Sequence, residues 1–150
     1  MPETLFFAAN EIITLTKNGV WMSDDIEITH EGTRQLFFKI LTLENGHWFL
    51  KLGKEIKEIT VEDTAYFVKR VDLEPGLKQA TLTLAGGSKE PLKHQTLHYK
   101  PGRLTCKLAN GFEAKFVGSA YFELLSHLEE DERAYFLTFG DERVELAPKS

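Results

Sequence analysis

The sequence predicts an α+β protein made of two tandem β-β-α-β-β units, in which mainly antiparallel sheets each pack on one helix. The first observation is an internal repeat, because the segment 48–55 (WFLKLGKE) has a near copy at 135–142 (YFLTFGDE). The second is a set of short runs in which hydrophobic and polar residues alternate, which is typical of half-buried strands. The third is the helical spacing of hydrophobic residues in 31–43 and 119–128.

The first unit begins with a hairpin signal. Asn18-Gly19 lies between two hydrophobic runs, and both residues tolerate a positive φ. Thr29 is the predicted N-cap of the helix over 31–43, and Asn45-Gly46 is predicted to end that helix. The strands that we expect in this unit are 12–15, 20–22, 48–52 and 55–61, with a short extended piece at Ile26 and Ile28 before the helix.

In the second unit, the runs 104–108 and 112–116 flank an Asn-Gly pair. A two-residue loop would place their hydrophobic side chains on opposite faces, because a slip of one residue reverses the face of a strand. A three-residue loop over 109–111 brings all of them inward. We therefore predict a bulged hairpin with Gly111 in the left-handed region and Lys115 on the outer, solvent-facing side. The other strands that we expect are 65–71, 81–84, 135–139 and 143–146.

Length and composition limit the possible functions. The chain has 150 residues and a formal net charge of −5, which argues against a general nucleic-acid-binding protein. No hydrophobic run is long enough to span a membrane, and no signal peptide is recognisable, so we expect a cytoplasmic protein with no membrane partner. Cys106 is the only cysteine, and its alternating surroundings predict a small buried hydrophobic residue. We expect one domain over residues 1–63 and a larger one over 64–150.

The sequence lacks the common catalytic motifs, including G-x-S-x-G and H-E-x-x-H, and its five histidines are scattered. We therefore expect no catalytic residue, no metal site and no cofactor. Two repeated units would meet along a seam, and a cleft at such an interface is a favoured place for a small ligand.

Several side chains suit such a ligand. Lys115 and Arg34 could contact a phosphate group. Glu62 or Asp63 could accept hydrogen bonds from sugar hydroxyls, and an aromatic residue such as Trp21 could stack on a flat ligand. Each has a structural alternative, because exposed basic residues are commonly solvated, acidic pairs fit strand-end turns and aromatic residues commonly pack in cores.

Two stretches resemble a bacterial family known as domain of unknown function 1285. The first combines N-G-V-W at 18–21, G-H-W-F-L at 46–50 and V-E-D at 61–63. The second is F-E-A-K-F at 112–116, followed by the tyrosine-containing helix at 120–124. The family's V-E-D-x-P-F segment lacks its proline here, and the arginine of its L-E-A-R motif is a lysine, which keeps the charge but loses the planar fork.

The resemblance implies a duplicated core whose second half is superficially similar to pleckstrin-homology-like folds. It also implies a binding site at the domain interface, a nucleotide-like ligand and a role in signalling. The residues that match the family's motifs, and that we expect at the ligand, are Trp21, Glu62, Asp63, Glu113, Lys115 and Tyr121.

We therefore predict a non-catalytic ligand-binding or sensing module of a bacterial signalling pathway. It would bind a small anionic or nucleotide-like molecule where its two units meet. The alternatives are a protein-interaction adaptor that uses exposed sheet edges such as 81–84, and a hydrolase that uses Glu62 and Asp63.

Overall fold

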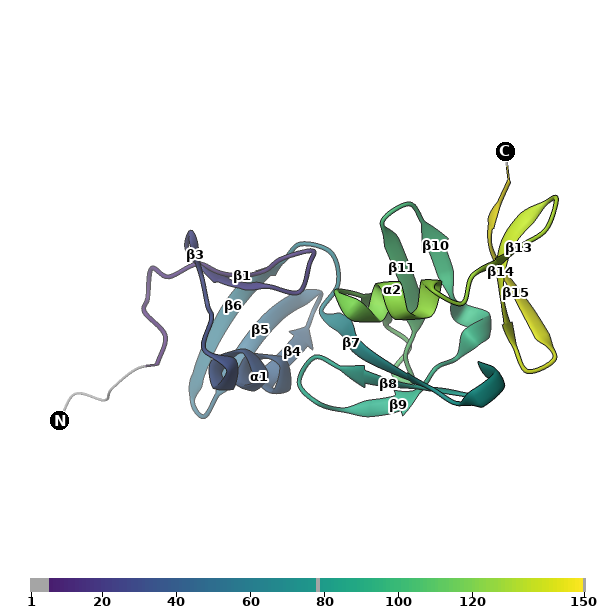
Figure 1. Ribbon diagram of the computed structural model, residues 1–150. Helices are drawn as coiled ribbons and strands as arrows, with labels where there is room; N and C mark the ends of the chain where they lie inside the picture. The colour runs from purple at the N-terminus through teal and green to yellow at the C-terminus, as the bar shows by residue number, and fades with distance from the viewer. Residues whose placement is uncertain (1–5, 78, 150) are drawn as a thin grey trace. The chain divides into compact units, whose positions relative to one another are not determined.

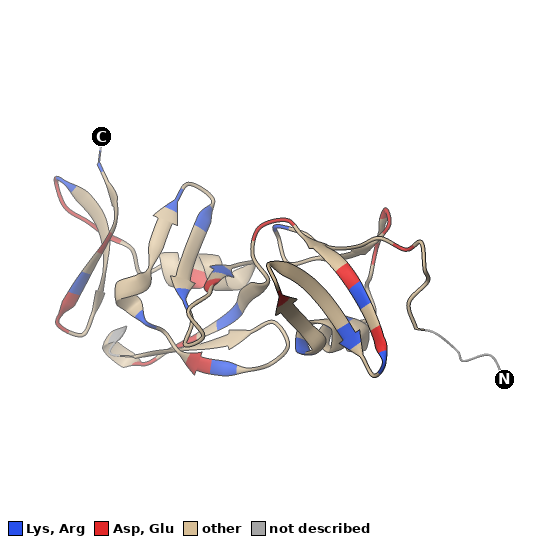
Figure 2. Ribbon diagram, turned by 180° about the vertical axis from the view of Figure 1, so that it is seen from behind, with Lys and Arg blue, Asp and Glu red and all other residues tan. Residues whose placement is uncertain are grey.

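The computed structural model describes residues 6–77 and 79–149 and divides the chain into two compact units. Unit 1 ends at Ala65, and unit 2 begins at Tyr66. Neither helix in the described part of the chain combines the length and hydrophobicity that crossing a bilayer requires. Basic and acidic residues are interspersed along the strands of both units (Figure 2).

The described part of unit 1 contains one helix and a six-stranded sheet of order β3-β2-β1-β6-β5-β4 (Figure 1). The central strands β1 and β6 pair in parallel, and the other neighbours are antiparallel. The helix α1 packs against β5. The elements are β1 (Ile13–Leu15), β2 (Trp21–Ser23), β3 (Ile26–Glu27), α1 (Glu31–Ile40), β4 (Leu41–Glu44), β5 (His47–Leu52) and β6 (Glu55–Val61).

Unit 2 contains a second six-stranded sheet, of order β10-β11-β12-β7-β8-β9, and a separate sheet of order β13-β14-β15. The helix α2 packs against β7. The elements are β7 (Tyr66–Leu73), η1 (Pro75–Leu77), β8 (Ala80–Leu84), β9 (Lys89–Pro91), η2 (His94–Thr96), β10 (His98–Lys100), β11 (Arg103–Lys107), β12 (Glu113–Phe116), α2 (Ser119–Leu125), β13 (Glu129–Glu130), β14 (Ala134–Phe139) and β15 (Glu142–Pro148).

The two six-stranded sheets have the same connectivity. Each consists of two antiparallel meanders of three strands, and the first strand of one meander pairs in parallel with the last strand of the other. The helix joins the two meanders in unit 1, whereas it follows the second meander in unit 2. The predicted α+β class, with two units, mainly antiparallel sheets and a helix packed on each, is therefore confirmed.

The repeated segments that the sequence pairs are not equivalent in this architecture. Residues 48–55 belong to the β5–β6 hairpin of a six-stranded sheet, whereas 135–142 belong to the β14–β15 hairpin of the smaller sheet. Their likeness is local, because both hairpins turn at a glycine with positive φ, Gly53 (61°) and Gly140 (60°). The structural repeat instead relates β1–β6 to β7–β12.

Helix α1 differs from the prediction at both ends. His30 is the N-cap in place of Thr29, because its Nδ1 accepts a hydrogen bond from the Thr33 N–H at 3.1 Å. The helix ends at Ile40, and the extended backbone of Leu41 starts β4, a strand that we did not predict. Asn45 and Gly46 form the two-residue turn between β4 and β5. The described part of unit 1 therefore has six strands: the four predicted ones, the unpredicted β4, and β3 where we expected a short extended piece.

The β11–β12 hairpin has the predicted register. Cys106 lies opposite Ala114, and the N–H of Leu108 donates to the Phe112 carbonyl at 2.9 Å. Gly111 has a φ of 86°, as the three-residue loop requires. Phe112 is an exception to the predicted inward pattern, because it precedes the first residue of β12 and is 39% exposed.

Three further expectations are corrected. Lys115 is buried rather than solvent-facing, because both faces of β12 are covered, as the burial of the consecutive residues Ala114, Lys115 and Phe116 shows. The helix α2 ends at Leu125, three residues earlier than predicted. The run 81–84 lies in β8, which pairs with both β7 and β9, so it is not the sheet edge that the adaptor hypothesis named.

Candidate functional site

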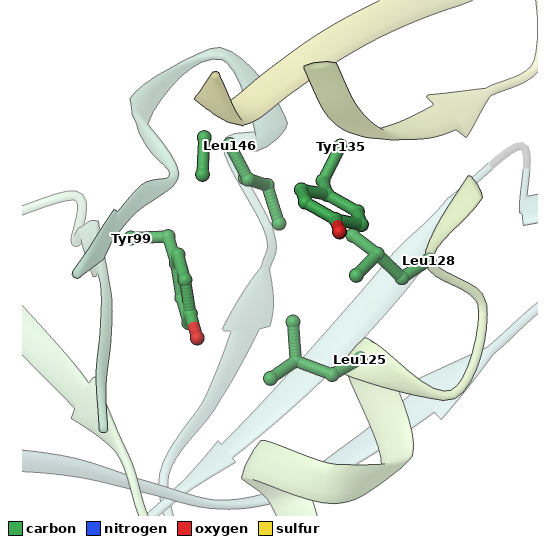
Figure 3. Close-up of a pocket in the computed structure, with 6 residues that line it drawn as sticks. Tyr99, Leu125, Leu128, Tyr135 and Leu146 are labelled. Atoms are coloured by element: carbon green, nitrogen blue, oxygen red, sulfur yellow. The ribbon is translucent and has the colours of Figure 1, made fainter. Parts of the chain in front are cut away.

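A hydrophobic pocket lies within unit 2, between the end of α2 and the strands β10, β14 and β15. Its volume is about 200 Å³. Figure 3 shows the lining side chains around a common hollow. They are Tyr99, Leu125, Leu128, Tyr135, Leu146 and Ala147.

The wall formed by β15 depends on an irregular register. Neighbouring residues of a regular strand point to opposite faces of a sheet. Here Tyr135 pairs with Ala147 and Phe136 pairs with Glu145, so Leu146 is an extra residue opposite the Tyr135–Phe136 step. A bulge of this kind re-aims side chains. It explains why two consecutive residues, Leu146 and Ala147, both line the pocket.

The helical wall follows from the way α2 ends. Leu124 is fully buried in the core of unit 2, and the next residue, Leu125, reaches the pocket. The chain then turns tightly, since the N–H of His127 donates to the Leu124 carbonyl and the N–H of Leu128 donates to the Leu125 carbonyl. This turn brings Leu128 to the same pocket, where it stays 39% exposed.

A pair of tyrosine hydroxyls supplies the polar part of this region. The hydroxyls of Tyr99 and Tyr121 are hydrogen bonded to each other, and the Tyr121 oxygen also accepts from the backbone N–H of Gly102. Burial raises the pKa of Tyr121 above its ordinary value of 10.0, and the hydrogen bond to Tyr99 raises it further. The Tyr121 phenol is therefore protonated at neutral pH.

The lining residues are tyrosines, leucines and an alanine, so none of them has an ordinary pKa near 7. Such a surface can exclude water and hold a ligand, but it offers no general base at neutral pH. A hydrophobic pocket with a few polar groups is the usual form of a small-molecule site. The geometry therefore favours binding over catalysis.

In unit 1, the predicted ligand residue Trp21 is a core residue. Its side chain is fully buried and packs edge-on against Phe37 and Phe38, with ring centroids at 5.2 and 5.3 Å. The indole therefore has no exposed face on which a ligand could stack. The expectation of ligand stacking is corrected, and the core-packing alternative holds for this residue.

The charged residues predicted in unit 1 have structural partners or lie in connections. Glu62 accepts a hydrogen bond from the Lys17 N–H at 2.9 Å and thereby holds the β1–β2 loop. Arg34 forms an ion pair with Glu31 on α1. Asp63 is exposed in the segment that follows β6.

In unit 2, the predicted residues lie in two places. Glu113 is exposed and forms an ion pair with Arg103 at 3.3 Å. Lys115 is 8% exposed and lies opposite Thr105, whose hydroxyl is buried without a hydrogen-bond partner among the described residues. Tyr121 alone is tied to the pocket, through its hydrogen bond to Tyr99.

The sequence analysis did not identify the six lining residues as a site. Leu125 and Leu128 belong to the hydrophobic stripe of the predicted helix, and Tyr135 begins the repeated segment. These signals indicate packing rather than a ligand. The register shift in β15 that completes the pocket leaves no recognisable pattern in the sequence.

Reactive groups in the described residues are few. Burial, together with the nearby carboxylates of Glu90 and Glu113, raises the pKa of Cys106 to about 12, so this thiol is a poor nucleophile. The described part of the chain contains no cluster of three or more histidine, cysteine, aspartate or glutamate residues that could hold a metal ion.

Comparison with known proteins supports the fold. No family model and no curated protein matches the sequence. The chain is similar to the crystal structure of a DUF1285 family protein from Silicibacter pomeroyi, with a TM-score of 0.67 and 19% identity over 91% of this chain and 79% of that chain. It is also similar to a DUF1285 family protein from Shewanella baltica, with a TM-score of 0.58 and 14% identity over 79% of this chain and 94% of that chain. The chain therefore has a DUF1285-like fold, as the sequence motifs predicted.

Proposed function

We propose that this chain is a non-catalytic module that binds a small molecule in the hydrophobic pocket of unit 2. The observation that carries the proposal is the bulge in β15, which turns both Leu146 and Ala147 toward the same hollow. Bulges re-aim side chains and are frequent next to functional sites. Protein interiors are normally close-packed, so a bulge needed only for packing would be expected to have its surroundings filled, whereas a space of about 200 Å³ lies beside this one.

The character of the residues supports binding without catalysis. The described residues that line the pocket are leucines, tyrosines and an alanine, and none of them carries a carboxylate, an imidazole or a thiol. The only thiol of the chain belongs to Cys106, which is buried with a pKa of about 12. We propose in addition that this binding serves a sensing role in a signalling pathway.

An anionic or nucleotide-like ligand is a second candidate, with Lys115 as its cationic contact. The observation that favours it is the buried hydroxyl of Thr105, which lies opposite Lys115 and has no hydrogen-bond partner among the described residues. An ammonium group beside a hydroxyl can provide charge-assisted hydrogen bonds to a phosphate oxygen. The adaptor alternative stays a prediction, now for β9 and β10, the edge strands of this sheet.

One experiment separates the two ligand sites. The full chain is purified from cells, co-purified small molecules are identified by native mass spectrometry, and the same molecules and a nucleotide panel are titrated against the emptied protein. We expect a ligand whose binding is lost in Ala147→Leu, which fills the pocket, and retained in Ala109→Leu, which adds the same side chain to an exposed turn.

The anionic candidate gives a different pattern in this experiment. A nucleotide would bind equally to the wild type and to Ala147→Leu, and Lys115→Met would abolish its binding. Circular dichroism checks that each variant is folded. A protein that retains no molecule, binds no nucleotide and responds to no ligand in a broad fragment panel would contradict the proposed function.

A further inference from the structure

The size of the pocket limits its ligand. Drug-sized ligands occupy pockets of roughly 300–1,000 Å³, whereas this pocket holds about 200 Å³. A hydrophobic cavity of roughly 150 Å³ is enough to bind benzene in a well-studied engineered protein. The volume therefore suits a molecule of one or two rings and is too small to enclose a whole nucleotide.

The walls favour an aromatic molecule. Tyr99 and Tyr135 come from different strands, and Figure 3 shows their rings on either side of the hollow, with Leu125 and Leu146 between them. Aromatic rings attract one another in offset-stacked or edge-to-face arrangements at centroid separations of about 4.5–7 Å. A planar ring between two tyrosines can make such contacts on both sides, in addition to its contacts with the leucines.

The polar groups of the lining side chains are the hydroxyls of Tyr99 and Tyr135, and the Tyr99 hydroxyl is the one held by a neighbouring residue, Tyr121. The Tyr99 hydroxyl is already bonded to Tyr121, but a hydroxyl has one donor and two acceptor positions, so its oxygen can accept a further bond. Among the described residues, Lys149 is a basic residue that contacts a lining side chain: its Nζ lies 5.4 Å from the centre of the Tyr135 ring and 3.0 Å from a carboxylate oxygen of Glu130. A carboxylate on a ligand in this pocket would therefore face hydrophobic side chains, with the Lys149 ammonium already paired to Glu130, which is unfavourable.

We infer that the pocket of unit 2 takes a neutral aromatic molecule of one or two rings that donates one hydrogen bond to Tyr99, as a phenol or an indole does. This inference rests on the proposed function and adds the chemical class of the ligand. Tyr121 contributes by holding the Tyr99 hydroxyl in place, because its own oxygen is fixed by the Gly102 N–H. Tyr121 is thus a positioning residue for the site.

The test titrates the full chain with five probes, p-cresol, indole, toluene, benzoate and AMP, and follows binding by amide chemical shifts. We expect p-cresol and indole to bind and to shift amides of α2, β10 and β15. Benzoate and AMP should leave these amides unchanged. Ala147→Leu should abolish the binding of p-cresol, and the surface control Ala109→Leu should retain it.

Tyr99→Phe tests the polar contact without filling the pocket. Loss of one neutral hydrogen bond should weaken p-cresol binding about 2- to 12-fold, while toluene binding stays the same. Tyr121→Phe should weaken p-cresol binding by less than Tyr99→Phe, because it removes the support of the acceptor and not the acceptor itself.

Three outcomes would overturn the inference. Benzoate could bind more tightly than p-cresol, toluene could bind as tightly as p-cresol, or Tyr99→Phe could leave the affinity for p-cresol unchanged. If a ligand of another class binds and Ala147→Leu blocks it, the proposed function stands and the inferred class is wrong. If neither these probes nor any co-purified molecule binds, both are wrong.

Discussion

Replacing Trp21 with phenylalanine should leave the stability of unit 1 nearly unchanged, although this side chain is fully buried. The reason is the indole nitrogen. Its N–H is buried and has no hydrogen-bond partner among the described residues, so the folded state bears its desolvation cost. Phenylalanine keeps a ring next to Phe37 and removes that group.

The expected size of the effect follows from two opposing contributions. The substitution removes two ring carbons, which loses roughly 1.6 kcal/mol at about 0.8 kcal/mol for each buried carbon. It also removes a buried unpaired donor, which recovers about 1–3 kcal/mol. The free energy of unfolding of Trp21→Phe should therefore lie within about 1 kcal/mol of the wild-type value, taking cavity relaxation into account. Trp21→Ala also removes the indole N–H, but it loses the whole buried ring and leaves a large cavity, so it should cost about 3–5 kcal/mol.

Urea unfolding followed by tryptophan fluorescence measures both variants. The chain has two tryptophans, and Trp48 on β5 remains in each variant as a reporter of unit 1. A loss in Trp21→Phe as large as the loss in Trp21→Ala would mean that the indole N–H has a partner, and the reasoning would fail. A Trp21→Phe variant of normal stability that no longer binds the ligand would restore the sequence-based assignment of Trp21 to the ligand.

Three further predictions concern single residues of unit 2. The hydrogen bond from Arg143, with two from nearby backbone amides, lowers the pKa of Asp131 from 3.8 to about 2. The stability that this carboxylate contributes is therefore complete above about pH 4 and is lost as the pH falls toward 2. Asp131→Asn should reduce the pH dependence of the urea midpoint between these values. Identical pH profiles of the wild type and the variant would refute the assignment. Because burial raises the pKa of Cys106 to about 12, iodoacetamide at pH 8 should label this thiol only after unfolding, and rapid labelling of the folded chain would contradict its burial. Gly111→Ala should lower the free energy of unfolding by about 1 kcal/mol through the φ of 86° alone, since a Cβ there would meet no described atom within 4 Å. Gly111→Asn should lower it by less, because asparagine tolerates a positive φ better than alanine. Equal losses of stability for the two variants in thermal unfolding would argue against backbone strain.

Sequence patterns predicted the structure well where the neighbouring residues alone decide the geometry, as they do in a hairpin. The β11–β12 register follows from two alternating runs, because only a three-residue loop aligns their hydrophobic faces. The same kind of pattern failed at the end of α1. Residues 36–41 have helical spacing, yet Leu41 is already extended, and tertiary pairing of β4 with β5 outweighs the helical preference. Asn45-Gly46 was a hairpin signal that we interpreted as a helix stop.

The candidate site was harder to predict because its residues carry no chemical signature. Leucines and tyrosines at the end of a helix indicate a core, and only the register shift opposite Tyr135 separates a packed junction from a pocket. The charged residues that the sequence suggested lie elsewhere: Glu62 holds the β1–β2 loop, and Arg34 forms an ion pair within α1. Tyr121 was identified through the family motif, but its link to the pocket depends on Tyr99, which no motif contains.

The parallel pairing at the centre of each sheet has a consequence for folding during synthesis. Thr14 pairs with Thr60, and Tyr66 pairs with Ala114, so each sheet is closed by contacts between segments far apart along the chain. Such long-range contacts form slowly, because the entropy of loop closure must be overcome before they are made. Neither sheet can be completed until its last strand has left the ribosome, so nascent unit 1 should remain open until residue 61 emerges and should then fold before the synthesis of unit 2 is complete.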